Sequence, residues 1–273
     1  AAYNRFYYTD ILGIDPATAR TAVLWGSGHH FTGIPPWKAK TELWLSGTIV
    51  RDACDMSPDS MDRHLEQINR ARPDIIRAWP GALCELSEHA LRNKMNLHSP
   101  KAIVTSGETL HARARETIEK AWGAKVHNFY GSRELSNLAG ECECGNLHVL
   151  ANKIEVIAGD GKQASEGQEG DVIVTGLNNY SMPFIRYMIG DVAVQGPARC
   201  KCGRPGPTLK NVSGRLVEQF TRKDGAVVPG VYFVHLLDRI MWNGSISKFQ
   251  VVQEDYDTVL ILAIVSENLS VEY

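Results

Sequence analysis

The stretch from Asn128 to Glu143 reads Asn-Phe-Tyr-Gly-Ser-Arg-Glu-Leu-Ser-Asn-Leu-Ala-Gly-Glu-Cys-Glu, and the rest of the chain can be placed around it. Residues Ala124 to Phe129 have the composition of a short strand, which the following glycine and serine end in a tight turn. Such a turn lies at the carboxyl end of a strand, where open α/β sheets bind their ligands. The alternative interpretation is a surface turn whose Glu134 caps a helix that begins near Leu135.

Strands and helices are predicted to alternate on the amino-terminal side of this stretch. The expected strands are Thr21 to Trp25, Glu42 to Val50, Asp74 to Trp79 and Ala102 to Thr105, and the expected helices are Ser57 to Arg70, Pro80 to Met95 and Thr109 to Trp122. A regular alternation of this kind is typical of a parallel sheet with helices packed against it. The sequence therefore predicts an α/β fold with a parallel-type sheet and flanking helices.

On the carboxyl-terminal side, strand patterns replace the helical ones. Strands are expected over Leu147 to Ala158 and Asp171 to Leu177, followed by an extended run from Pro183 that Asp191 ends. Further on, the pattern predicts a strand from Leu216 to Thr221, a helix from Pro229 to Met241 and a hairpin from Ile246 to Val265. We therefore expect a β subdomain and then the start of a small α+β domain.

Four cysteines form two Cys-x-Cys pairs, each followed by a glycine: Cys142 with Cys144, and Cys200 with Cys202. Four thiolates from two knuckle-like turns would complete a tetrahedral zinc site, which is typical of a structural metal rather than a catalytic one. His148 is a competing ligand, so the sequence leaves open which four of the five residues bind. The alternative is that the thiols are reduced and unliganded.

Composition excludes several function classes. The 273 residues carry a formal net charge of −2, which gives no electrostatic reason to expect nucleic acid or an anionic membrane as a partner. The longest strongly apolar run, Val259 to Val265, is too short to cross a bilayer, and no signal-peptide pattern is recognisable at the amino terminus. The expected location is therefore the cytoplasm.

Several motifs follow one another in an order that resembles a known family. They are Ser106-Gly-Glu108, Tyr130-Gly-Ser-Arg-Glu134, Ala139-Gly-Glu-Cys142, Leu147-His148, Pro183-Phe-Ile-Arg-Tyr-Met-Ile-Gly-Asp191, Cys200-Lys-Cys-Gly-Arg204 and Ser213-Gly-Arg215. Taken together, the motifs resemble the adenylate-forming (acyl-CoA synthetase) superfamily, in the branch of phenylacetate-CoA ligases and their capsule-biosynthesis relatives. They run through most of the chain.

This resemblance implies an ATP-dependent acid–thiol ligase that forms an acyl- or aryl-adenylate and then a coenzyme A thioester. Its implied catalytic residues are Glu134, which would hold Mg²⁺, and Arg215, at the phosphate or a hinge. The implied contacts to ATP or AMP are Ser106, Gly107, Glu108, Asn128, Phe129, Tyr130, Gly131, Ser132, Arg133, Arg186 and Asp191, the last of them at the ribose. The substrate would be a small carboxylic acid, and a homodimer is left open.

The resemblance also sets out the expected domains. Residues 1–212 would form the adenylation core, with a zinc-binding β subdomain at about 140–210, and residues 213–273 would begin a small mobile domain. The family's upstream phosphate loop and terminal lysine are not recognisable here, so we expect a partial enzyme, and Arg133 replaces a threonine of the superfamily. Two alternatives remain: transfer of the acyl group to an amine or carrier protein, and a non-catalytic, zinc-stabilised binding or scaffold protein.

Overall fold

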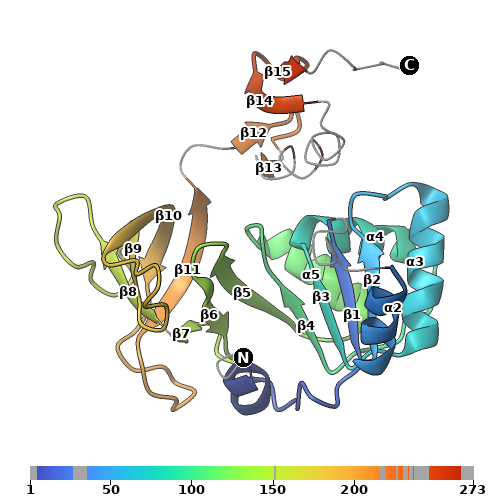
Figure 1. The fold of residues 1–273 in the computed structure, drawn as a ribbon, viewed down its shortest axis with the longest axis horizontal. Helices are drawn as coiled ribbons and strands as arrows, with labels where there is room; N and C mark the ends of the chain where they lie inside the picture. The colour runs from blue at the N-terminus through green and yellow to red at the C-terminus, as the bar shows by residue number, and fades with distance from the viewer. Residues whose placement is uncertain are drawn as a thin grey trace. The chain divides into compact units, whose positions relative to one another are not determined.

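The computed structural model describes residues 5–26, 36–150, 152–215, 219–225, 227–229, 233, 236 and 246–265. The chain divides into two compact units, Ala1–Gly214 and Arg215–Tyr273. The first unit contains an 11-stranded sheet with the strand order β2-β1-β3-β4-β5-β6-β7-β11-β10-β9-β8 (Figure 1). That these units are an adenylation core and the start of a mobile domain stays a prediction.

The amino-terminal half of the sheet is parallel and confirms the predicted α/β fold. Its strands are β1 (Thr21–Trp25), β2 (Thr48–Asp52), β3 (Ile75–Ala78), β4 (Ala102–Thr105) and β5 (Val126–Ser132). Between them run the helices α2 (Pro36–Leu45), α3 (Pro58–Ala71), α4 (Pro80–Arg92) and α5 (Ala112–Trp122). The prediction of a strand over Glu42 to Val50 was wrong in its first part, because α2 continues to Leu45 and β2 begins only at Thr48.

Alternate residues of the parallel strands enter two separate cores. On one face, Ile76 and Ile103 join a cluster with the buried side chains of α3, α4 and α5. On the other face, Ile75 and Val104 pack with the short π-helix η1 (Tyr7–Ile11). The sheet is thus covered on both sides here, as the continuous apolar character of β4 requires.

The sheet becomes antiparallel from β6 onward. The strands are β6 (Ser136–Glu141), β7 (Leu147–Val149), β8 (Asn152–Ile157), β9 (Glu169–Gly176), β10 (Tyr187–Gln195) and β11 (Thr208–Arg215). The long strand expected from Leu147 to Ala158 is in fact two, β7 and β8, and Asp191 lies inside β10 instead of ending an extended run. The helix considered near Leu135 is absent, since this residue lies in the turn before β6.

The second unit contributes two short antiparallel pairs among its described residues. One joins β12 (Gln219–Thr221) to β13 (Val227–Pro229), and the other joins β14 (Ile246–Gln253) to β15 (Val259–Val265), which confirms the expected hairpin. The helix expected from Pro229 to Met241 lies largely outside the described residues. In the part of the chain that the structure describes, no helix has the length and apolar character needed to span a membrane.

Candidate active site and metal centre

The segment that carries most predicted nucleotide contacts forms the tip of the β5–β6 hairpin. Ser132 pairs with Ser136, so the loop consists of Arg133, Glu134 and Leu135, and the first two side chains are exposed. The Leu135 N–H donates to Ser132 Oγ at 3.1 Å, which closes the turn. A Cβ on Gly131 would lie 2.7 Å from the Ser136 carbonyl oxygen, so only glycine fits the bulge that precedes the loop.

Tyr130 connects this hairpin to the distant aspartate motif. Its hydroxyl donates a hydrogen bond of 2.7 Å to Asp191 Oδ2, between residues 61 positions apart, and both residues are 8% exposed. The next side chain toward the amino terminus points to the opposite face, where the Phe129 ring packs 4.9 Å from that of Tyr7, centroid to centroid. The Phe129 side chain therefore packs in a core, whereas Tyr130 and Asp191 form one polar unit.

The motif Ser106 to Glu108 directly follows β4, at the carboxyl edge of the parallel strands. The Ser106 N–H donates to the Ala78 carbonyl at 3.2 Å, and Gly107 has a φ of +90°, a conformation that favours glycine. Glu108 Oε2 accepts the Gly81 N–H at 2.9 Å in the first turn of α4. The carboxylate thus complements the amino terminus of α4, and burial raises its pKa above the usual value while this hydrogen bond opposes the rise.

Two predicted arginines are placed differently from each other. Arg186 Nη1 lies 2.8 Å from Glu155 Oε1, and the residue has an unusual φ of +49°. Its guanidinium is therefore paired within the β subdomain, and its contact to nucleotide stays a prediction. Arg215 ends β11, and its side chain lies outside the described residues.

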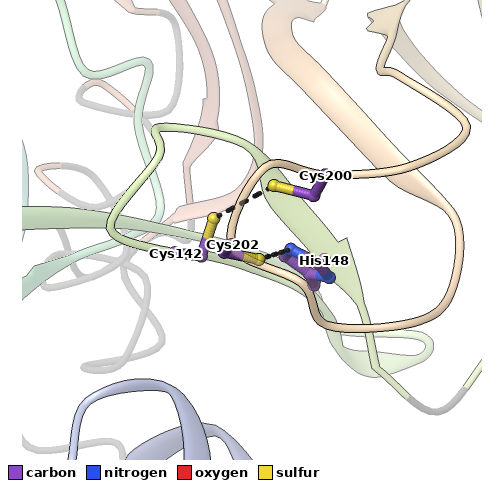
Figure 2. Close-up of side chains that lie close together, drawn as sticks. All are labelled: Cys142, His148, Cys200 and Cys202. Atoms are coloured by element: carbon purple, nitrogen blue, oxygen red, sulfur yellow. Dashed lines mark hydrogen bonds between the residues drawn. The ribbon is translucent and has the colours of Figure 1, made fainter.

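Four of the five predicted metal ligands come together. The donor atoms of Cys142, His148, Cys200 and Cys202 all lie within 4.8 Å of one another (Figure 2). The Cys142 and Cys200 sulfurs are 3.7 Å apart, and Cys202 Sγ is 3.2 Å from His148 Nε2. Sulfurs bound tetrahedrally to one zinc at about 2.3 Å would be about 3.8 Å apart. Cys144 is exposed and stands outside this group of four.

The electrostatics of the two buried thiols suit a cation. Burial raises the pKa of Cys142 to about 12. Burial also opposes ionisation of Cys200, but hydrogen bonds from the Cys202 backbone and the Asn146 side chain outweigh it and lower the pKa of Cys200 to about 6. The neighbouring Asn146 Oδ1 is buried and has no hydrogen-bond partner among the described residues. Closely spaced thiolates repel one another, and a divalent metal bound between them would compensate their negative charge.

Two residues beside the site were not among the predicted ones. Glu141, which directly precedes the first metal-ligand candidate, accepts two hydrogen bonds from Arg115 Nη2, at 2.9 and 2.8 Å, and one from the Asn128 N–H at 2.5 Å. Glu141 belongs to the quoted central stretch, but Arg115 lies in an ordinary amphipathic helix. The only signal for Glu141 is a carboxylate in a strand between Gly140 and Cys142, and no sequence signal marks Arg115.

Comparisons with known proteins agree with these motifs. No protein-family model matches the chain. Protein CapK of Staphylococcus aureus is 26% identical over 214 residues, which cover 77% of this chain and 46% of CapK. The phenylacetate-coenzyme A ligase of Thermus thermophilus is 26% identical over 177 residues, which cover 62% of this chain and 40% of the ligase. The chain therefore spans less than half the length of these curated relatives.

Among solved structures, a 2-hydroxyisobutyryl-CoA ligase in complex with an acyl-AMP has a similar fold. The TM-score is 0.63 at 22% sequence identity, and the similarity covers 97% of this chain and 57% of the other. An amide bond synthetase of Marinactinospora thermotolerans has a TM-score of 0.55 at 18% identity. The sequence relatives confirm the resemblance in the motifs to the phenylacetate-CoA ligases and CapK, and the solved structures show a shared fold.

Proposed function

We propose that the protein is an ATP-dependent acid–coenzyme A ligase that forms an acyl- or aryl-adenylate and then the thioester. The observation that carries this proposal is the 2.7 Å hydrogen bond between Tyr130 and Asp191, because it joins two motifs of the superfamily into one polar unit. Sequence similarity to the phenylacetate-CoA ligases supports the same reaction.

Each side chain has a role that its chemistry allows. The exposed carboxylate of Glu134 at the hairpin tip would hold hydrated Mg²⁺, which prefers oxygen ligands and keeps several waters. Asp191 would accept both ribose hydroxyls, and Tyr130 fixes the orientation of that carboxylate. Arg133, exposed beside Glu134, would face phosphate, for which a guanidinium is well suited. Catalysis would then depend mainly on positioning and charge stabilisation.

Binding and exchange measurements on the full-length protein test this proposal. We expect saturable binding of ATP with Mg²⁺ by titration calorimetry, and acid-dependent exchange of pyrophosphate into ATP. Glu134→Gln should abolish the Mg²⁺ dependence of ATP binding. Asp160 is another exposed turn carboxylate, and Asp160→Asn should leave this dependence unchanged. Absence of ATP binding would overturn the proposal. Pyrophosphate exchange without formation of a coenzyme A thioester would instead indicate that an amine or a carrier protein accepts the acyl group.

We also propose that Cys142, His148, Cys200 and Cys202 hold a structural zinc. The proposal is supported by the closeness of their donor atoms and by a soft donor set that leaves no position open for substrate. The native protein should contain one zinc per chain by elemental analysis. Cys142→Ser should lose this metal, and Cys144→Ser is the matched control that should retain it. Equal zinc content in the two variants would refute this choice of ligands.

A further inference from the structure

Asn128 lies where β5 changes its pairing partner. Up to this residue β5 pairs in parallel with β4, with Thr105 opposite Asn128, and from Phe129 it pairs antiparallel with β6. At the junction the Asn128 N–H is satisfied by a side chain, since it donates to Glu141 Oε2 at 2.5 Å. A carboxylate therefore completes the hydrogen bonding of the strand that leads into the hairpin tip.

The carboxylate of Glu141 is itself held from α5. Arg115 Nη2 approaches both of its oxygens, at 2.9 and 2.8 Å, and Arg115 Nη1 donates to the Val126 carbonyl at 2.5 Å. The Glu141 side chain is only 9% exposed and that of Arg115 31%. Charge-assisted hydrogen bonds in such a place are short and directional, so one carboxylate fixes α5, β5 and β6 to one another.

The neighbours of Glu141 restrict its strand further. Gly140 lies against the Tyr7 ring, and the Tyr7 hydroxyl donates to the Glu141 carbonyl at 3.3 Å. On the other side, Cys142 belongs to the group of four metal-ligand candidates. These contacts hold Glu141 from both sides, so we infer that the position of its carboxylate sets the position of Asn128, two residues before Tyr130.

We propose that Arg115 and Glu141 are positioning residues that hold the segment Asn128 to Glu134 in the arrangement that binds nucleotide. This inference rests on the proposed function and extends it to two residues that would not touch the ligand. Glu141→Gln keeps an oxygen for the Asn128 N–H but removes the charge that holds Arg115. If the segment then adopts its binding arrangement about one tenth of the time, the apparent Kd for ATP rises about tenfold.

The test compares variants of the full-length protein by calorimetric titration with ATP and Mg²⁺ and by steady-state kinetics. For Glu141→Gln we expect the Kd and KM for ATP to rise about tenfold while the KM for coenzyme A stays unchanged. Asp74→Asn is the matched control, because Asp74 also accepts a backbone N–H, from Arg20 at 2.9 Å, and pairs with Lys101. Asp74 lies just before β3, at the amino ends of the parallel strands, whereas Asn128 lies level with the carboxyl end of β4. The loss of the Asp74 charge should therefore leave the Kd for ATP unchanged.

Arg115→Lys keeps the protein testable if Glu141→Gln does not fold. This variant retains a positive charge for Glu141 and the hydrogen bond that the Asn128 N–H donates to Glu141, but it loses the second nitrogen, which donates to the Val126 carbonyl. We therefore expect a smaller rise in the Kd for ATP. Wild-type affinity in every folded variant would overturn the positioning role, as would an equal loss in Asp74→Asn. No ATP binding by the wild-type protein would overturn the proposed function itself, which keeps the two failures distinct.

Discussion

At the scale of single residues, close backbone approaches make certain glycines indispensable. A Cβ on Gly140 would lie 2.2 and 2.4 Å from two carbons of the buried Tyr7 ring. We therefore expect Gly140→Ala to lower the free energy of unfolding by about 1 to 3 kcal/mol, the usual cost of overpacking a core. Urea denaturation measures this change.

The matched substitution for comparison is Gly159→Ala. A Cβ at Gly159 would meet no described atom within 4 Å, and the residue is not among those with positive φ. Its free energy of unfolding should stay unchanged or rise by about 0.5 kcal/mol, because alanine restricts the unfolded chain. Equal destabilisation by both substitutions would contradict the packing argument for Gly140.

The residue scale also shows which parts of the site the sequence could predict. Tyr130, Asp191 and the cysteine pairs stand in local motifs, so their chemistry was readable from a few neighbouring letters. The pairing of Arg115 with Glu141 depends on how α5 packs beside β5 and β6, which no local pattern encodes. Likewise, only the folded chain shows that Cys144 stands outside the group of four while His148 lies within it.

At the scale of elements, the sequence predicts the bounds of two buried strands correctly but misses the end of helix α2. The segments Thr21–Trp25 and Ala102–Thr105 match their predicted bounds, since the first alternates half-buried with buried residues and the second is buried throughout. In α2 the side chains of Trp37, Trp44 and Leu45 are 71%, 79% and 71% exposed. Apolar residues on the solvent side hide the helical period, so the sequence pattern at the end of α2 favours a strand.

An element-scale prediction concerns the amino edge of the parallel strands. The Asp74 carboxylate accepts the Arg20 N–H at 2.9 Å and lies 3.1 Å from Lys101 Nζ, so it connects the segments that enter β1, β3 and β4. The hydrogen bond from the Arg20 backbone is the main cause that lowers the pKa of Asp74, with Lys101 assisting. A carboxylate with a lowered folded pKa contributes stability above its unfolded pKa of about 3.9 and loses it as the pH falls further.

Asp74→Asn should therefore cost about 0.5 to 1 kcal/mol at neutral pH, because asparagine keeps an oxygen for the Arg20 N–H but loses the charge that pairs with Lys101. The difference between the variant and the wild type should shrink as the pH falls below about 4, because the wild-type carboxylate is then protonated as well. Urea denaturation between pH 7 and pH 2.5 follows this difference. A gap of constant size across that range would show that the charge of Asp74 does not contribute.

At the scale of the whole molecule, the sheet of the first unit has one junction between its parallel and antiparallel halves, and the metal-ligand candidates lie close beyond it. Cys142 directly follows β6, His148 lies in β7, and Cys200 and Cys202 lie between β10 and β11. Strand β7 pairs with β11 at only two positions, Leu147 with Leu209 and His148 with Thr208. Few backbone hydrogen bonds thus connect the first seven strands to the remaining four, so a metal at this point would hold the two parts together.

If the proposed zinc is bound there, its removal should weaken the whole first unit. A ligand that binds only the folded state contributes about 3 kcal/mol when present at a hundredfold its Kd, so chelation should lower the free energy of unfolding by at least about that amount. Thermal denaturation with and without a chelator measures the loss, and hydrogen exchange should rise in β7 and β11 but not in the hairpin of β14 and β15. The thermal stability of Cys200→Ser should not change when the chelator is added, whereas that of Cys144→Ser should fall as in the wild type. A wild-type protein indifferent to chelation would show that the sheet holds together at this junction without a metal.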